Sequence, residues 1–125
     1  MARIRGAGNR STEMRLIAFM RSHGINGWRR GFNLPGKPDF VFPRLKITVF
    51  VDGCFWHGCP LHATAPKQNA QFWREKLSRN QARDRLVNRT LRARGWIVLR
   101  IWEHELARRN ERQLLSRLNR HLARR

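Results

Sequence analysis

The stretch DFVFPRLKITVFVD, residues 39–52, decides the fold of this chain. It contains two runs, 39–42 and 46–51, that are rich in β-branched and aromatic residues, with a short break around Pro43 between them. Such runs are typical of strands, and a break of this length lets the two strands pair as a hairpin. Asp39 opens the first run and Asp52 follows the second. The sequence therefore predicts a hairpin with a carboxylate at each end.

Before the hairpin, apolar residues at helical spacing predict a helix over residues 12–22, with Ser11 as its N-cap and Gly24 as a left-handed C-cap. Residues 1–10 are basic and contain glycine, and we expect them to be flexible. Residues 26–33 resemble a ragged strand. The segment 34–38 holds two prolines and a glycine, which predicts a turn.

After the hairpin, the pattern predicts a long helix over residues 71–94, ended by Gly95, and a strand over residues 96–102. That strand is almost wholly apolar, so we expect it in a central position, buried on both sides. From Glu103 a basic helix should run to the C-terminus, covering residues 105–125. A strand, a crossover helix and a strand favour an α/β fold with a mixed central sheet between helices, in a single domain over residues 1–125.

The charge points to a polyanionic partner. The 27 Lys and Arg residues outnumber the 8 Asp and Glu residues, for a formal charge of +19. Nucleic acid is the first candidate, and double-stranded DNA is the partner we expect. The sequence has no apolar run of about 18 residues and no lipidation signal, so we expect no membrane association. We find no secretory signal and expect a monomeric cytoplasmic protein, on the nucleoid when bound to DNA.

A second group of residues suggests a zinc site. The segment CFWHGCPLH, residues 54–62, holds two thiols and two imidazoles. Cys54, Cys59 and His62 can supply three ligands of a structural Zn²⁺. His104 is the best distant fourth ligand, because strand 96–102 should run beside the strand that ends at Asp52. The loop 52–67 is too long and too poor in core residues to order without a cross-link, although two cysteines can also be ordinary small core residues.

The few carboxylates suggest a catalytic site. Phosphodiester hydrolysis needs hard oxygen ligands for Mg²⁺ and a group that takes a proton from water. Asp39 is a candidate for the principal Mg²⁺ ligand, and His57 is a candidate for the base. Simpler explanations also exist. Glu13 in a first helical turn complements the helix dipole, while Asp39 and Asp52 are both common turn residues.

Four ordered blocks carry a resemblance to a known family. They are LPGKPDF at residues 34–40, VFVDGCFWH at 49–57, FWREKL at 72–77 with Asn80 and Arg83-Asp84 after it, and GWIVLRIWE at 95–103. Together these blocks resemble the signature of Vsr endonucleases, the enzymes of very short patch mismatch repair. The resemblance implies a restriction-endonuclease-like α/β/α core. It also implies Mg²⁺-dependent nicking of DNA beside a thymine mispaired with guanine, and a structural zinc.

The resemblance implies roles for individual residues. Asp39 matches the essential metal-binding aspartate, and the main-chain carbonyl of Val51 falls at a second Mg²⁺ ligand. Glu13 matches a glutamate that supports the site through water. His57 matches the histidine that activates the attacking water.

The next loop follows the same pattern. Phe55 and Trp56 match an aromatic pair that wedges into the base stack, which is easiest at a mispair. The zinc ligands also transfer, with exchanges of Cys and His that zinc tolerates, and they are Cys54, Cys59, His62 and His104.

This sequence departs from the family at several points. Asp52 stands where the family has a histidine near the scissile phosphate, so it is an additional candidate Mg²⁺ ligand. The chain starts late and should lack an N-terminal segment that enters the opposite groove. Lys67 and Lys76 are candidate phosphate contacts. Asp84 lies on the apolar face of the long helix, where we expect a hydrogen bond or an ion pair with an arginine.

Two other functions stay open at this point. The first is a nickase of relaxed specificity associated with phage defence or restriction. The second is a zinc-containing DNA-binding module without catalysis. Mismatch-repair proteins are candidate partners.

Overall fold

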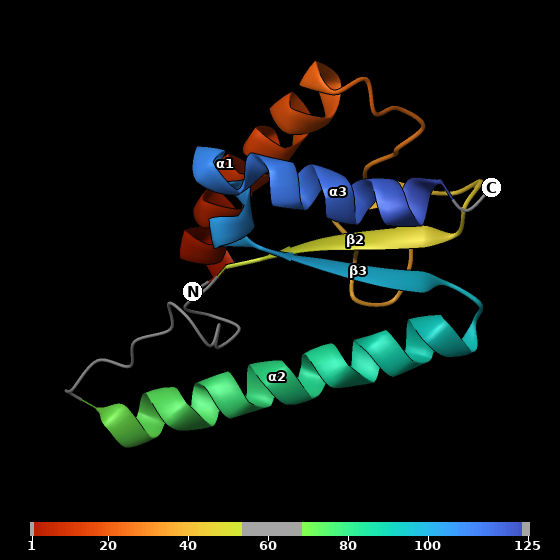
Figure 1. The fold of residues 1–125 in the computed structure, drawn as a ribbon. Helices are drawn as coiled ribbons and strands as arrows, with labels where there is room; N and C mark the ends of the chain where they lie inside the picture. Colours follow the sequence, from red (N-terminus) through yellow and green to blue (C-terminus); the bar gives the residue numbers. More distant parts are fainter. Residues whose placement is uncertain (1, 54–68, 124–125) are drawn as a thin grey trace.

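The computed structural model describes the backbone of residues 2–53 and 69–123, and the side chains within those ranges from residue 12 onward. The elements follow in the order helix, hairpin, long helix, strand, two short 3-10 turns and helix (Figure 1). They are α1 (Ala2–Ser22), β1 (Phe40–Phe42), β2 (Ile47–Asp52), α2 (Ala70–Ala93), β3 (Ile97–Trp102), η1 (Glu103–Leu106), η2 (Arg108–Asn110) and α3 (Glu111–Leu122).

The described strands form one mixed sheet in the order β1-β2-β3. β1 and β2 are antiparallel, with Phe40 opposite Val49, which confirms the predicted hairpin. β2 and β3 are parallel and in register through the pair Asp52 and Trp102. The polypeptide therefore leaves β2 and β3 at the same end of the sheet, as expected for two strands joined by a crossover helix.

Helices cover both faces of this sheet. Figure 1 shows α1 and α3 on one side of β2 and β3 and α2 on the other. Alternate side chains of the strands point to opposite faces. One set packs under α1 and α3 and forms the core, with Phe40, Phe42, Ile47, Val49, Val51, Leu99 and Ile101. The other set faces α2 and includes Phe50, Asp52 and Arg100. The mixed α/β architecture predicted from the sequence is confirmed.

Within the described part of the sheet, β3, the strand expected at the centre, lies at an edge. Among the described strands β2 is central, and all six of its residues are buried, whereas in β3 only Leu99 and Ile101 are. The expectation was wrong because helix packing on a strand's faces also selects apolar residues. An apolar run therefore does not distinguish a central strand from an edge strand.

Two helix boundaries also differ from the prediction. α1 begins at Ala2, so residues 2–11 are helical and Ser11 is not an N-cap. The expected C-terminal helix is divided, because Ala107 has an extended backbone (ψ 145°) between η1 and η2. The Glu105 carboxylate accepts the Trp102 N–H (2.8 Å), which tightens this turn instead of continuing a helix. The cap at Gly24 (φ +69°) and the stop at Gly95 (φ +87°) are confirmed.

Several finer predictions also find a place in the structure. The ragged segment 26–33 makes a single β-bridge between Arg29 and Val41. The turn over residues 34–38 closes with a hydrogen bond from the Lys37 N–H to the Leu34 carbonyl (3.0 Å). None of the described helices combines the length and the apolar character needed to cross a membrane.

Candidate functional site

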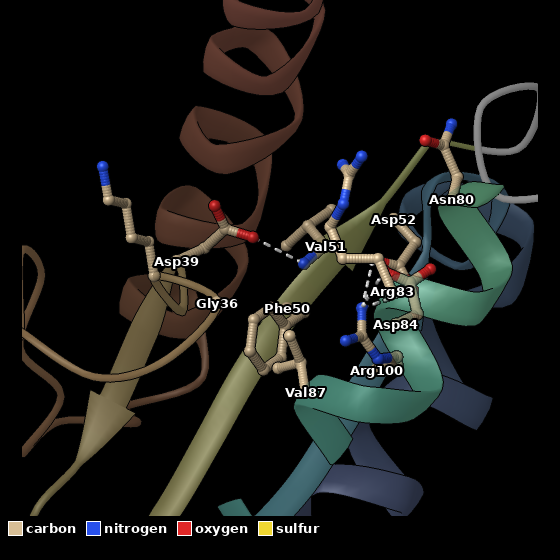
Figure 2. Close-up of a pocket in the computed structure, with 11 residues that line it drawn as sticks. Gly36, Asp39, Phe50, Val51, Asp52, Asn80, Arg83, Asp84, Val87 and Arg100 are labelled. Carbon is tan, nitrogen blue, oxygen red and sulfur yellow. Dashed lines mark hydrogen bonds and ion pairs between the residues drawn. The ribbon is translucent and has the colours of Figure 1, made fainter. Parts of the chain in front are cut away.

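A pocket opens where the hairpin, β3 and α2 meet. Its wall includes Asp39, which directly precedes β1, and Val51 and Asp52 at the end of β2. Arg100 enters from β3, and Asn80, Arg83 and Asp84 enter from α2 (Figure 2). Asp39, Val51 and Asp52 were selected from the sequence as site residues, and the structure brings them together with a set of cations. Three basic residues, Lys37 being the third, balance three aspartates in the wall.

Asp39 is the carboxylate whose environment is most altered. Its Oδ2 accepts the Val51 N–H at 2.7 Å, and this bond is drawn in Figure 2. Burial raises the pKa of Asp39 from 3.8 to about 6, against the lowering effect of that hydrogen bond. The negative charges of Glu13 and Asp52 add to the rise, and the Arg100 cation opposes it. Asp39 is therefore held in a place where its own charge is poorly compensated.

The main chain of Val51 faces the same carboxylate. In an extended strand the N–H and C=O groups of one residue point to the same flank. The Lys46 carbonyl accepts the Ile97 N–H (2.7 Å), so even-numbered residues here turn toward β3 and odd-numbered residues toward β1. The Val51 N–H reaches Asp39, and so the Val51 carbonyl lies on the flank of Asp39 as well. β1 begins only at Phe40, so this flank is not covered by β1.

This arrangement suits a divalent cation. No residue of the described part of the chain binds the second oxygen of Asp39, and a carbonyl oxygen lies on the same flank of β2. A hard cation such as Mg²⁺ prefers these oxygen ligands and retains several waters. The described residues contain no group of three His, Cys, Asp or Glu side chains able to enclose a metal. A site with few protein ligands and the remainder from water is the one that fits here.

Glu13, on α1, is a second carboxylate that acts on Asp39. Its carboxylate accepts a hydrogen bond from Arg30 (2.8 Å), and the Glu13 side chain is only 17% exposed. Its negative charge is one of those that raise the pKa of Asp39, so the two carboxylates are near neighbours. Arg30 holds Glu13 in place without neutralising Asp39.

Asp52 is bound by an arginine. Both of its oxygens accept hydrogen bonds from Nη1 of Arg100, at 3.0 and 3.2 Å, and its side chain is 6% exposed. The Asp84 carboxylate lies 3.6 Å from the same nitrogen, which confirms the ion pair expected for Asp84. Arg100 was not among the site residues predicted from the sequence. Its signal was a single charge inside the apolar run IVLRIW.

The remaining candidates fall into two groups. Lys76 lies on α2 and His104 in η1, both half-buried. The other candidates lie outside the described residues, and their expected roles stay predictions; they are Cys54, Phe55, Trp56, His57, Cys59, His62 and Lys67.

The comparisons with known proteins agree with one another. The family model described as DNA mismatch endonuclease Vsr matches residues 1–63. The DNA mismatch endonuclease Vsr of Escherichia coli (strain K12) is 36% identical over 112 residues, which cover 86% of this chain and 71% of that protein. The type II nicking enzyme V.NaeI of Lentzea aerocolonigenes is 53% identical over 77 residues, covering 62% of this chain and 46% of that enzyme. V.XorIIP of Xanthomonas oryzae, also a type II nicking enzyme, is 43% identical over 77 residues, covering 60% and 56%.

The mixed α/β architecture, with helices on both faces of the sheet and a carboxylate pocket at the strand ends, is that of the α/β proteins with a nuclease-like fold. Within that class, this chain belongs to the Vsr family of DNA mismatch endonucleases. The matched regions span about half the length of the most similar relatives, 46% and 56%.

Proposed function

We propose that this protein is a magnesium-dependent DNA endonuclease that nicks one strand of duplex DNA at or near a T:G mismatch. The observation that carries the proposal is the Asp39 pocket. It joins a poorly compensated carboxylate, a carbonyl on the same flank of β2 and several fixed cations, in a chain of formal charge +19. The Vsr family membership and the restriction-endonuclease-like core implied by the sequence blocks support it.

The Mg²⁺ site we propose uses Asp39 and the Val51 carbonyl. A bound Mg²⁺ would polarise the phosphoryl oxygen and stabilise charge that develops on it. The Val51 N–H fixes the rotamer of Asp39 by its hydrogen bond, which leaves the other carboxylate oxygen to the metal. Glu13, held by Arg30, orients water near Asp39. His57 takes the proton from the attacking water, since an imidazole changes charge near neutral pH.

DNA would lie across the pocket and along one flank of α2. Arg83 lines the pocket, and at 100° per residue Arg79 and Lys76 lie on the same flank, one and two turns nearer the start of the helix. Arg79 is exposed, and an exposed arginine on this flank suits a phosphate contact. Phe55 and Trp56 would open the base stack, and Lys67 would add a phosphate contact.

A structural Zn²⁺ would hold the loop that carries His57. We propose Cys54, Cys59, His62 and His104 as its ligands. Asp52 and Trp102 are register partners at the ends of β2 and β3, and Cys54 and His104 each follow two residues later. This spacing in the sequence is the reason for pairing Cys54 with His104 in the proposed ligand set. Metal analysis of purified protein should find about one zinc per chain, and finding none would remove this part of the proposal.

Nicking of a supercoiled plasmid in Mg²⁺ tests the enzymatic proposal. The wild type should convert supercoiled DNA to the open circle, whereas Asp39→Ala and His57→Ala should lose this activity by at least about a hundredfold. Both variants should keep the circular dichroism spectrum of the wild type. A plasmid nicked equally fast by Asp39→Ala would exclude the proposed metal site. Unchanged plasmid with folded wild type would favour a DNA-binding module without catalysis.

A second candidate function keeps the nickase but relaxes the substrate. The relatives named type II nicking enzymes favour it, because three of the matched proteins with the highest identities carry that description. Duplexes that differ only by a T:G mispair separate the two functions. A strong preference for the mispaired duplex supports mismatch repair, and equal rates support the restriction-associated nickase. We place the protein in the cytoplasm as a monomer, with mismatch-repair proteins as candidate partners.

A further inference from the structure

Arg100 is the most tightly held cation of the pocket. Its Nε donates to the Asn88 side chain (2.9 Å) from α2, and its Nη1 donates to Asp52 of β2. The guanidinium also lies over the Phe50 ring, 4.2 Å from the ring centre. Contacts from one neighbouring strand, β2, and from one helix, α2, therefore fix the position of its plane. An arginine fixed in this way loses little entropy when it binds a further group.

The arginine keeps donor capacity toward the pocket. Nε and Nη1 account for its hydrogen bonds, and in the described part of the chain no residue accepts one from Nη2. The side chain is 19% exposed and lines the same pocket as Asp39. Guanidinium groups match the oxygens of a phosphate, and a donor fixed before the reaction stabilises the transition state at no cost of reorganisation.

Asp52 is in a different situation from Asp39. Its oxygens are both bound by a cation, whereas Asp39 receives only one neutral N–H donor. A carboxylate shared with a buried guanidinium is a poor metal ligand, because the metal would have to displace or repel that cation. The function that this geometry leaves to Asp52 is to position Arg100.

We propose that Asp52 and Arg100 act as a unit in which Asp52 is no metal ligand but holds Arg100 as a fixed cation for a non-bridging oxygen of the DNA phosphodiester. The inference rests on the proposed function, and it assigns a second cation to the reaction from the protein itself. Arg100 then contacts substrate, and Asp52 is a positioning residue.

Metal binding tests the first half of the inference. Mn²⁺ binding to the protein without DNA can be followed by electron paramagnetic resonance, with wild type, Asp39→Asn and Asp52→Asn compared. Asp39→Asn should weaken Mn²⁺ binding by about tenfold or more, while Asp52→Asn should change it by less than about threefold. Equal losses in the two variants would show that Asp52 is a metal ligand and overturn the inference.

Phosphate recognition tests the second half. Duplexes with the nicked linkage intact, or with one of its non-bridging oxygens replaced by methyl, are bound in Ca²⁺ so that cleavage does not interfere. The wild type should bind the neutral linkage about tenfold more weakly, and Arg100→Gln should show a clearly smaller difference between the two duplexes, because only the contact with the metal ion then remains. Arg100→Lys, which keeps the charge, should restore part of the difference. An equal penalty in wild type and Arg100→Gln would overturn the inference.

Two controls keep these outcomes separate. If Arg100→Gln does not fold because the buried Asp52 carboxylate loses this cation, the double variant Asp52→Asn/Arg100→Gln removes both charges and takes its place in the same comparison. Wild type that fails to nick DNA in Mg²⁺ contradicts the proposed function. Wild type that nicks DNA, but shows the same methyl penalty as the variants, contradicts only the role of Arg100.

Discussion

Asp39 stands at a position that is unfavourable for its own charge. Burial and the neighbouring carboxylates Glu13 and Asp52 raise its pKa to about 6, although the Val51 N–H partly compensates. A residue that destabilises its own folded state commonly belongs to a functional site, where a ligand supplies the missing compensation. Here a divalent cation would do so. Removing the charge of Asp39 should therefore lower the activity and raise the stability of the metal-free protein.

The Asp39→Asn substitution tests this opposition. Asparagine can still accept the Val51 N–H through its side-chain oxygen, but it carries no charge to be desolvated. Without added Mg²⁺ or Mn²⁺ at pH 7.5, we expect the variant to be more stable than the wild type by about 1–3 kcal/mol, which corresponds to a Tm higher by about 4–11 °C. Nicking should be lost. Thermal melts in buffer without added Mg²⁺ or Mn²⁺ measure the first effect, and a lower Tm than wild type would contradict it.

The pH dependence of metal binding follows from the same pKa. Mg²⁺ binds the carboxylate, so the proton and the metal compete for Asp39 below about pH 6. Mn²⁺ affinity should be nearly constant above pH 7 and fall by up to about tenfold per unit below pH 6. In metal-free protein the sign reverses. The folded state binds the proton more tightly than the unfolded state, so this contribution to stability is present at low pH and is lost as the pH rises from 3.8 to about 6.

Calorimetric titration with Mn²⁺ at several pH values measures the affinity. Asp39→Asn is the matched control, since its residual binding should lose the dependence on pH near 6. A wild-type affinity that stays constant down to pH 5 would contradict the role of Asp39 as the metal ligand.

At the scale of elements, the turn before β1 is packed directly against α2. Gly36 has φ +78°, and a Cβ added there would lie 2.5 Å from Cγ1 of Val87. Glycine is therefore required twice, by the backbone conformation and by the close approach of the helix. This contact closes one wall of the pocket beside Asp39. The position of α2 over the site depends on it.

A pair of glycine substitutions separates these two requirements. Gly31 has a similar backbone angle, φ +71°, but nothing lies within 4 Å of an added Cβ. Gly31→Ala should cost about 1–2 kcal/mol from the left-handed backbone alone. Gly36→Ala should cost about 1–3 kcal/mol more, because the added methyl collides with Val87. Urea unfolding measures both. Equal losses would show that the Val87 contact does not matter.

At the scale of the whole molecule, basic residues are spread over the chain, but they differ in how far they can contact a polyanion. The E. coli relative named for mismatch cleavage and the nicking enzymes act on DNA, and a formal charge of +19 ensures strong and salt-dependent attraction to any polyanion. The structure distinguishes arginines that form ion pairs within the protein from arginines whose side chains are exposed. Arg117, for example, bonds to both oxygens of Glu105 (2.8 and 2.7 Å), which ties α3 to η1. On the flank of α2 beside the pocket, Arg79 and Arg83 are exposed, and these are the arginines we propose for DNA contact.

Two exposed arginines of α2 test this distinction. Arg79 is one turn from Arg83 on the pocket flank, whereas Arg85 is rotated by 200° from Arg83 and lies on the opposite flank. Arg79→Gln should weaken duplex binding and reduce the slope of log K against log salt concentration by about 1. Arg85→Gln, with the same loss of charge, should leave the slope almost unchanged. Fluorescence anisotropy at several salt concentrations measures both slopes. Equal effects would indicate that DNA binding depends on the total charge and not on the position of each arginine.

Sequence by itself determined the elements that rest on local chemistry. Alternating β-branched and aromatic residues specified the hairpin, glycines placed the ends of α1 and α2, and the ordered blocks around Asp39 and Asp52 identified the family. Side-chain period and turn chemistry are properties of neighbouring residues, so a single sequence carries them. Tertiary structure alone decided which strand is central, because strands and helices cover apolar residues alike. It also decided that Arg100 binds Asp52. That contact joins residues 48 positions apart, and only the parallel register of β2 and β3 brings them together.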